Sequence, residues 1–410
     1  MAKTFASIDV GTSKVSSIVA NLGDGGTIQI LGVGVVPSGG VHKGLVVNID
    51  EAKEAIRESV MRAERTSGLR IESAYVGVTG RHISSLNSRG VVATTRSDKR
   101  VTADDLDRVL ESARSITIPS DRRLLHVIPR HYTLDGQVAV KEPVGMHSFR
   151  LDVETHIVTV SAASVQNLIK SIRGVGVEID NLVLSPLAAG ETVLSADERN
   201  AGVILADIGA GTTDVAIFKE GCVWHSAILP VGGYQVTRDI AIGLGIPNEL
   251  AEEMKRKYGN LMTTNDVRAE HSELDVGNRH TVSYRELNDI IRVRVEEVLQ
   301  LVMMEIPRGE WDVLAPAGLV LTGGTANIPG IDLLAREVLD MQHVRVGVPG
   351  DITGIADTLH DPASATSVGL LFWGANHESD DEWRMEELRP GVIGTLKNSV
   401  LSARRFLRGR

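Results

Sequence analysis

Two short stretches of the chain combine residues that could hold a phosphate group together with a metal ion. In each stretch an aspartate is followed by a glycine turn and hydroxyl side chains, first from Asp9 and again from Asp207. Backbone N–H groups can converge on a phosphate where no Cβ interferes, and hydroxyls add donors. The expected donors are Gly11, Thr12 and Ser13 in the first stretch and Gly209, Gly211, Thr212 and Thr213 in the second. The carboxylates of Asp9 and Asp207 would hold Mg²⁺ through water.

The repetition strengthens this interpretation. One such turn alone is weak evidence, because Asp-Gly turns are common in purely structural hairpins. Here both turns lie between apolar runs, so each predicts a hairpin of strand, turn and strand. The chain is therefore expected to contain two halves that begin in the same way. A ligand would lie in the cleft between them.

Strands and helices alternate after both turns. In the first half we expect a strand at 28–36, a helix at 50–66 with Asp50 as its N-cap, and a strand at 73–78. This half resumes with a strand at 155–160 and a helix at 164–173. In the second half a buried strand runs into Gly323 and Gly324. Such alternation predicts an α/β protein whose sheets are mostly covered.

Two segments interrupt the alternation and predict inserted subdomains. The first has a capped helix at 102–114, a polar strand pair at 124–140 and a loop at 142–149; the second is mostly helical and charged. The predicted division is a first lobe at 1–80 and 156–190, an insert at 81–155, a second lobe at 191–243 and 309–373, a second insert at 244–308, a linker at 374–391 and a terminal helix at 392–410.

Composition excludes several classes of protein. The 410 residues suffice for more than one domain, since single cores stop growing at about 250 to 300 residues. A net charge of −10 argues against nucleic acid as a partner. The single cysteine, Cys222, rules out an internal disulfide and any cysteine-based zinc site. No run of apolar residues is long enough to predict a membrane-spanning helix or a signal peptide.

The chain resembles a known superfamily at three places. Residues 8–15, 206–218 and 321–331 are similar to the phosphate-1, phosphate-2 and adenosine motifs of the actin, Hsp70 and sugar-kinase superfamily. Within it the chain resembles the FtsA family of bacterial division proteins, through 185–190, 231–241, 251–259 and 361–371. The resemblance covers roughly residues 3 to 373. It implies a two-lobed actin-like fold of duplicated ribonuclease-H-like units, with the FtsA-type insert at 81–155.

The resemblance also implies a ligand, MgATP, and further site residues. It places Gly323, Gly324 and Thr325 near the adenosine, and Glu252 and Lys255 near the ribose and base. Lys14, Gly232 and Gly233 lie in the same motifs and are expected to bind the nucleotide as well. The Glu-x-x-Lys spacing is equally that of an ordinary ion pair on a helix surface.

One position departs from the pattern of filament-forming bacterial actins. Those proteins usually place a glutamate before the proline of this segment, where it orients the attacking water, whereas this chain has Ser185 before Pro186. A hydroxyl is a poor substitute for a water-orienting carboxylate. The chain is thus expected to be at most a slow ATPase that uses nucleotide mainly for assembly and conformation.

The C-terminus predicts an amphipathic helix beyond an acidic linker. Its apolar stripe comprises Val392, Ile393, Leu396, Val400 and Leu407, flanked by Lys397, Arg404 and Arg408. Such a helix packs either on its own core or on a membrane surface. Because it follows an acidic linker and has cations but no anions, we expect it to bind an anionic membrane.

Together these features predict a protein on the cytoplasmic side of the cell membrane, at the division site. By resemblance it would polymerise, anchor FtsZ filaments by their C-terminal tail and recruit later division proteins through the first insert. Arg285, Arg292 and Arg294 on a helix at 284–304 could meet the acidic tail, although a solvated helix face is nearly as good an explanation. The alternatives are an actin-like pilus-assembly ATPase, a small-molecule kinase of the same fold and an Hsp70-type chaperone. The last lacks a substrate-binding domain here.

Overall fold

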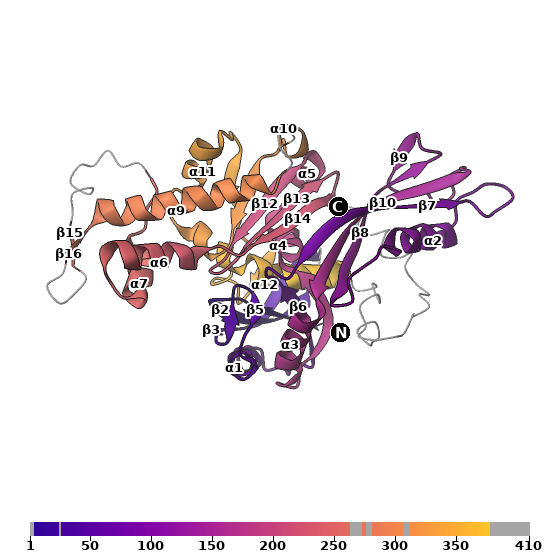
Figure 1. Ribbon diagram of the computed structural model, residues 1–410. Coiled ribbons are helices and arrows are strands. Elements are labelled where there is room, and N and C mark those ends of the chain that lie inside the picture. Colours follow the sequence, from indigo (N-terminus) through magenta and orange to yellow (C-terminus); the bar gives the residue numbers. More distant parts are fainter. Residues whose placement is uncertain (1–3, 24–25, 263–272, 276–280, 307–310, 378–410) are drawn as a thin grey trace.

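The computed structural model describes residues 4–23, 26–262, 273–275, 281–306 and 311–377. Two lobes form the body, and two smaller parts project from it on opposite sides (Figure 1). One projection contains α2 and the strands β7 to β10, and the other contains α7, α9 and the hairpin β15–β16. The predicted α/β class is confirmed.

The first lobe is built on a six-stranded sheet of order β11-β6-β1-β2-β3-β19. Its strands are β1 (Thr4–Val10), β2 (Lys14–Leu22), β3 (Ile28–Pro37), β6 (Ser73–Val78), β11 (Glu178–Leu184) and β19 (Ile352–Gly354). β1 and β2 pair antiparallel as a hairpin. β6 pairs parallel with β1, and β11 pairs parallel with β6. The first aspartate turn therefore joins two central strands. A short hairpin of β4 (Val41–His42) and β5 (Leu45–Val46) lies nearby.

Helices cover this sheet. α1 (Ile49–Ser67) packs on β2 and β3, and α3 (Ala162–Arg173) packs on α1. α1 begins because the side chain of Asn48 accepts hydrogen bonds from two free backbone N–H groups, and it ends at Gly68 with φ 69°. The N-cap is thus Asn48 and not the predicted Asp50, which lies in the first turn, where a negative charge favours the helix dipole.

The second lobe has a five-stranded sheet of order β14-β13-β12-β17-β18. Its strands are β12 (Val203–Ile208), β13 (Thr213–Lys219), β14 (Cys222–Leu229), β17 (Leu319–Thr322) and β18 (Val344–Val346). β12 and β13 form the second predicted hairpin. The helices here are α5 (Ala196–Ala201), α6 (Gly233–Leu244), α7 (Asn248–Tyr258), α9 (Tyr284–Met304), α10 (Trp311–Leu314) and α11 (Ile331–Leu339), with the hairpin β15 (Glu273–Asp275) and β16 (Thr281–Ser283).

Two helices lie between the lobes. α4 (Ser185–Val193) and α12 (Ala365–Asn376) pack on each other, and α12 also contacts β1 and β6. α12 continues past the predicted start of the linker at residue 374. Gly374 is buried so tightly that a Cβ there would lie 2.4 Å from the ring of Tyr75, and Trp373 stacks on His377. Packing against the core, which sequence patterning did not show, extends the helix.

The first insert is a four-stranded sheet of order β7-β10-β8-β9 with one helix. It comprises β7 (Ser84–Ala93), α2 (Ala103–Arg114), β8 (Arg122–Leu134), β9 (Val138–Val140) and β10 (Arg150–Ser161). The sequence predicted the helix, the strand pair at 124–140, which corresponds to β8 and β9, and a strand at 155–160 that it assigned to the first lobe. β10 also crosses the predicted boundary at 155/156, because it is one continuous strand that pairs with both β7 and β8.

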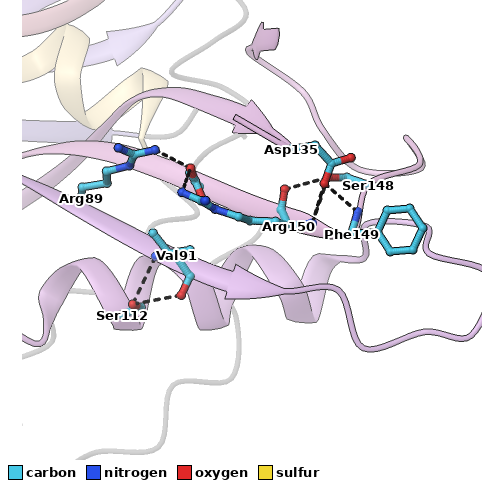
Figure 2. Close-up of polar contacts among 8 residues, drawn as sticks. Arg89, Val91, Ser112, Asp135, Ser148, Phe149 and Arg150 are labelled. Atoms are coloured by element: carbon cyan, nitrogen blue, oxygen red, sulfur yellow. Dashed lines mark hydrogen bonds and ion pairs between the residues drawn. The ribbon is translucent and has the colours of Figure 1, made fainter. Parts of the chain in front are cut away.

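Polar contacts fix the strand ends of the insert (Figure 2). Arg89 and Arg150 both reach the buried carboxylate of Asp152, and Asp135 accepts from the backbone N–H groups of Phe149 and Arg150. On the other side, α2 packs against the sheet around Tyr132, Leu151 and Val153. The insert therefore has a hydrophobic core of its own.

Candidate nucleotide-binding cleft

The two aspartate turns face each other across a cleft between the lobes, with a volume of about 810 Å³. Fifteen predicted site residues line it: Asp9, Gly11, Thr12, Ser13, Lys14, Asp207, Gly209, Gly211, Thr212, Gly233, Glu252, Lys255, Gly323, Gly324 and Thr325. Folding thus gathers residues from five separate segments. A cleft of this size is in the range of small-ligand sites.

The walls of the cleft approach each other so closely at two places that glycine is required there. A Cβ on Gly211 would lie 2.8 Å from Oγ1 of Thr12, and one on Gly233 would lie 2.7 Å from Oγ1 of Thr325. In the first turn the hydroxyl of Thr12 accepts from the N–H of Gly44 at 3.1 Å. The first glycine N–H of each turn is already bonded within its own turn, Gly11 to the carbonyl of Lys14 at 3.0 Å and Gly209 to that of Thr212 at 2.9 Å. The prediction that these two N–H groups bind phosphate therefore does not hold in this structure, and a phosphate would have to meet other groups of the turns.

Thr213 and Gly232 do not line the cleft. Thr213 is fully buried and its hydroxyl donates to the carbonyl of Val231 at 2.9 Å, so the prediction that it faces a phosphate is wrong. The reason is that Thr213 begins strand β13, where side chains alternate between faces. Gly232 instead allows close packing, since a Cβ there would lie 2.5 Å from the carbonyl oxygen of Gly209.

Three carboxylates share the cleft, of which Asp214 is buried and Asp9 and Asp207 are partly buried. Burial, and then the neighbouring charge of Asp207, raises the pKa of Asp9 to about 6, although Lys14 opposes the shift. Burial also raises the pKa of Asp207, against a hydrogen bond from Thr366 and the charge of Lys14. The pKa of Asp214 is raised well above its usual value by burial and by Asp207. A cation placed among them would relieve this repulsion.

This donor set fits a magnesium ion held through water. Carboxylates are hard oxygen ligands, and Mg²⁺ commonly keeps several waters in proteins. Within the described ranges, no group of three or more His, Cys, Asp or Glu side chains converges as a direct metal cage. Asp9 and Asp207 would therefore orient the water shell of an ion that neutralises phosphate charge. Other turn residues that line the cleft, among them Thr12, Gly211 and Thr212, would bind the phosphates themselves.

Glu252 and Lys255 line the cleft from α7, but Lys255 is already fully engaged. Its ammonium donates to the carbonyl of Gly233 at 3.0 Å, to Oγ1 of Thr237 at 2.8 Å and to Oε2 of Glu252 at 2.6 Å. An ammonium has three donors, so all are used within the protein. Lys255 thus fastens α7 to the start of α6 rather than offering a free cation to the ribose.

Sequence reasoning missed several residues of the cleft. Asp214 and Thr366 stand within motifs that the resemblance already marked, so their motifs could have indicated them. Tyr234 likewise stands in a marked stretch, directly after Gly233. Thr79 could not be found, because nothing in its local sequence points to the cleft. Further unpredicted lining residues include Arg256, Asn327 and Asp361.

Ser185 lies in the cleft wall at the start of α4. It is 2% exposed, and its hydroxyl has no hydrogen-bond partner among the described residues. A buried hydroxyl without a partner is unusual unless it meets water or a ligand. The position predicted to face the attacking water therefore does reach the cleft, but with a hydroxyl and not a carboxylate.

The three predicted partner-binding arginines do not form one patch. All lie on α9, but Arg292 pairs with Glu296 and with Glu337 of α11, whereas Arg294 pairs with Asp239 of α6. Arg285 is more exposed and pairs at 3.7 Å with Asp289. Residues nine apart on a helix point in opposite directions, so Arg294 lies away from Arg285.

The predicted terminal helix, 392–410, lies outside the described residues. Among the residues that the structure does describe, no helix has the length and apolar character that crossing a membrane requires.

Comparisons with known proteins agree with this architecture. Residues 204–369 match the family model described as Cell division protein FtsA, and residues 80–159 match the SHS2 domain inserted in FtsA. Among solved structures, a PilM–PilN type IV pilus biogenesis complex has a TM-score of 0.66 at 18% identity, over 90% of this chain and 98% of that one. MreB5 of Spiroplasma citri bound to ADP has a TM-score of 0.56 at 14% identity, over 93% and 99%. At these identities the likeness shows the fold alone.

Fold and cleft together define a two-lobed protein of the actin-like class, with an inserted SHS2 domain. Cell division protein FtsA of Pseudomonas aeruginosa is 40% identical over 97% of both chains, and that of Bacillus subtilis is 38% identical over 90% of this chain and 82% of its own. FtsA of Escherichia coli K12 is 34% identical over 96% of this chain and 95% of its own. The chain belongs to the FtsA family of cell division proteins.

Proposed function

We propose that the chain binds MgATP between its lobes, polymerises on the cytoplasmic face of the membrane and anchors FtsZ filaments there. The facing pair of glycine turns with their partly buried carboxylates is the observation that supports this most strongly. One lobe offers Thr12 and Asp9, the other Thr212 and Asp207, so a nucleotide between them would contact both. Nucleotide would thereby set the relative position of the lobes. Turnover would be slow, because Ser185 supplies no carboxylate.

The membrane role rests on the terminal segment. Its apolar stripe and its cations fit an interfacial helix, and anionic headgroups contribute about 1 kcal/mol for each basic residue near the surface. A helix tethered beyond α12 would hold the body on the membrane without spanning it. Later division proteins would then bind the first insert, which projects from the body.

The FtsZ tail would dock on the second insert. Of the three arginines named above, Arg285 is the most available, with 63% of its side chain exposed and only a loose pair to Asp289. Arg292 lies on the same side of α9 but already has two acidic partners. An acidic tail would therefore bind first through Arg285, with Arg292 exchanging its partners.

Electron microscopy on lipid monolayers tests this function as a whole. The full chain with ATP and Mg²⁺ is expected to form filaments on monolayers that contain anionic lipid. Isothermal titration calorimetry of ATP, with Mg²⁺ and with EDTA, tests the nucleotide step separately. Absence of ATP binding would exclude the proposal, whereas binding without filaments would exclude only the assembly step.

A further inference from the structure

The first insert contacts both lobes, although the chain joins it to the first lobe only. β6 of the first lobe leads into β7, and β10 leads back into α3. Across the gap to the second lobe, the hydroxyl of Ser85 donates to the carbonyl of Ser226 at 2.6 Å. His156 contacts the hydroxyl of Ser226 with Nε2 at 2.9 Å and the side chain of Asn87 with Nδ1 at 2.8 Å. β14 of the second lobe is thereby bound to β7 and β10.

A second set of contacts joins β8 to the same strand. The thiol of Cys222 donates to the carbonyl of Arg130 at 3.3 Å. The guanidinium of Arg130 lies 3.6 Å from the ring centroid of Trp224, and the arginine is only 7% exposed. Buried cation–π contacts and buried hydrogen bonds hold their partners more firmly than exposed ones. The insert is thus attached to the second lobe along much of β14.

Both attachments lead directly to the cleft. Ser226 pairs with Ala216 of β13, the strand that begins at the second aspartate turn. On the first lobe, Thr79 stands between β6 and β7 and donates to Oδ1 of Asp214 at 2.7 Å. The next residue, Gly80, has φ 129°, and a Cβ there would lie 2.9 Å from Nδ1 of His82. In the second lobe, the strand that carries the aspartate turn is therefore the direct neighbour of β14, which contacts the insert. In the first lobe, Thr79 at the cleft lies just before β7 of the insert.

We propose that the insert senses the angle between the lobes, so that nucleotide in the cleft and partners on the insert influence each other. This inference rests on the proposed nucleotide binding. When the lobes rotate, the insert cannot keep its covalent position on one lobe and its contacts with β14 on the other. It must turn with the second lobe or leave β14. By linkage, a partner that prefers one orientation of the insert changes nucleotide affinity by the same factor, typically 5- to 150-fold.

Distance measurements between spin labels test this in the full chain. Met61 on α1 and Met146 on the insert are 47% and 41% exposed, and their replacement by cysteine provides label sites. Cys222 is 1% exposed and should remain unlabelled in the folded protein. The label distance is expected to shift between the nucleotide-free protein and the protein with MgATP. In the Ser85→Ala/Ser226→Ala variant this shift should fall to less than half.

Ser84→Ala is the matched control, because Ser84 is exposed on the same strand and makes no side-chain bond with β14. Trp224→Leu is a second variant that removes the stacking partner of Arg130 if the serine pair proves too weak. An unchanged distance on addition of MgATP, with binding confirmed by calorimetry, would overturn the sensor alone. So would a full shift in both variants. Absence of ATP binding would overturn the proposed function and the sensor together.

Discussion

Thr366 donates from Oγ1 to Oδ2 of Asp207 at 2.8 Å, and so connects α12 to the aspartate of the second turn. The other carboxylate oxygen of Asp207 is confined by Gly323, where a Cβ would lie 2.3 Å from Oδ1. Gly323 has φ 86°, a conformation that side chains rarely adopt. One oxygen of the proposed magnesium-orienting carboxylate is therefore held by Thr366, and the other has room only because residue 323 is glycine.

Thr366→Val should weaken binding of MgATP by roughly 10-fold or more, since a hydrogen bond to a charged group contributes about 1.5–3 kcal/mol. Binding of ATP in EDTA should change much less, because Asp207 acts through the metal. Calorimetry under both conditions measures the difference. Thr192→Val is the control, as the buried Thr192 hydroxyl has no partner among the described residues. Asp207→Ala should likewise reduce the affinity for MgATP more than the affinity for ATP in EDTA. Equal losses of affinity under the two conditions would contradict a metal-orienting role for Asp207.

Asp9→Asn should stabilise the nucleotide-free protein at pH 7. Because the folded pKa of about 6 lies above the ordinary 3.8, the folded state holds an extra proton between these values. The parent therefore loses stability as pH rises through this window, on the order of 3 kcal/mol in total. Denaturant unfolding without metal, from pH 4 to pH 7, should show the two proteins diverging. Asp357→Asn, at an exposed carboxylate, should follow the parent; parallel curves for Asp9→Asn would refute the prediction.

Lys255→Met should lower the free energy of unfolding by about 2 kcal/mol, because it removes two buried hydrogen bonds from α7 to α6 and a third to Glu252 within α7. Lys257→Met makes the same change at an exposed position of the same helix and should stay within about 0.5 kcal/mol of the parent. Denaturant titration gives both values. If Lys255→Met instead reduced ATP affinity and left stability unchanged, the lysine would contact nucleotide as the family resemblance implies.

Phosphate release by the full chain with MgATP should stay below about 1 per second, low in the ordinary enzyme range. The reason is that Ser185 cannot act as a general base toward water. Ser185→Ala should therefore leave the rate nearly unchanged while preserving ATP affinity. A coupled phosphate assay on lipid vesicles measures the turnover of the parent and of the variant, and calorimetry measures their ATP affinity. A faster parent, or a variant that loses most of its turnover, would show that the hydroxyl takes part in hydrolysis.

Removal of 392–410 should abolish binding to anionic vesicles while ATP affinity and thermal stability stay nearly unchanged. Leu396→Glu should have almost the same effect, because it places a charge within the apolar stripe. The double variant Arg404→Ala/Arg408→Ala should lose vesicle binding only in part. This loss should be smaller at high salt, because the attraction to the headgroups is then screened in the parent as well. Vesicle flotation measures each. A truncated protein that melts well below the full chain would mean that the segment packs on the body.

Local sequence determined the two hairpins, the α/β class and the cleft residues that belong to the two aspartate turns. Each aspartate turn has apolar strands on both sides, and this pattern is readable without tertiary information because strand periodicity and glycine turns are local properties. The helix α2 was equally readable, since Thr102 and Asp105 cap it within four residues. By contrast Asn48, and not Asp50, begins α1, because capping depends on backbone conformation that one side chain does not reveal.

Tertiary structure alone decided how these parts act together. Thr79 comes from a loop, Asp214 from β13 and Thr366 from α12. Only the packed lobes bring their side chains together at one cleft, where Thr79 binds Asp214 and Thr366 binds Asp207. The same packing withdrew Thr213 into the core and enclosed the ammonium of Lys255 among three acceptors. Burial also raised the pKa of Asp9, since desolvation and the nearness of Asp207 exist only in the folded chain. Sequence sets which groups are present, whereas the folded environment sets their charge, their partners and the direction in which they point.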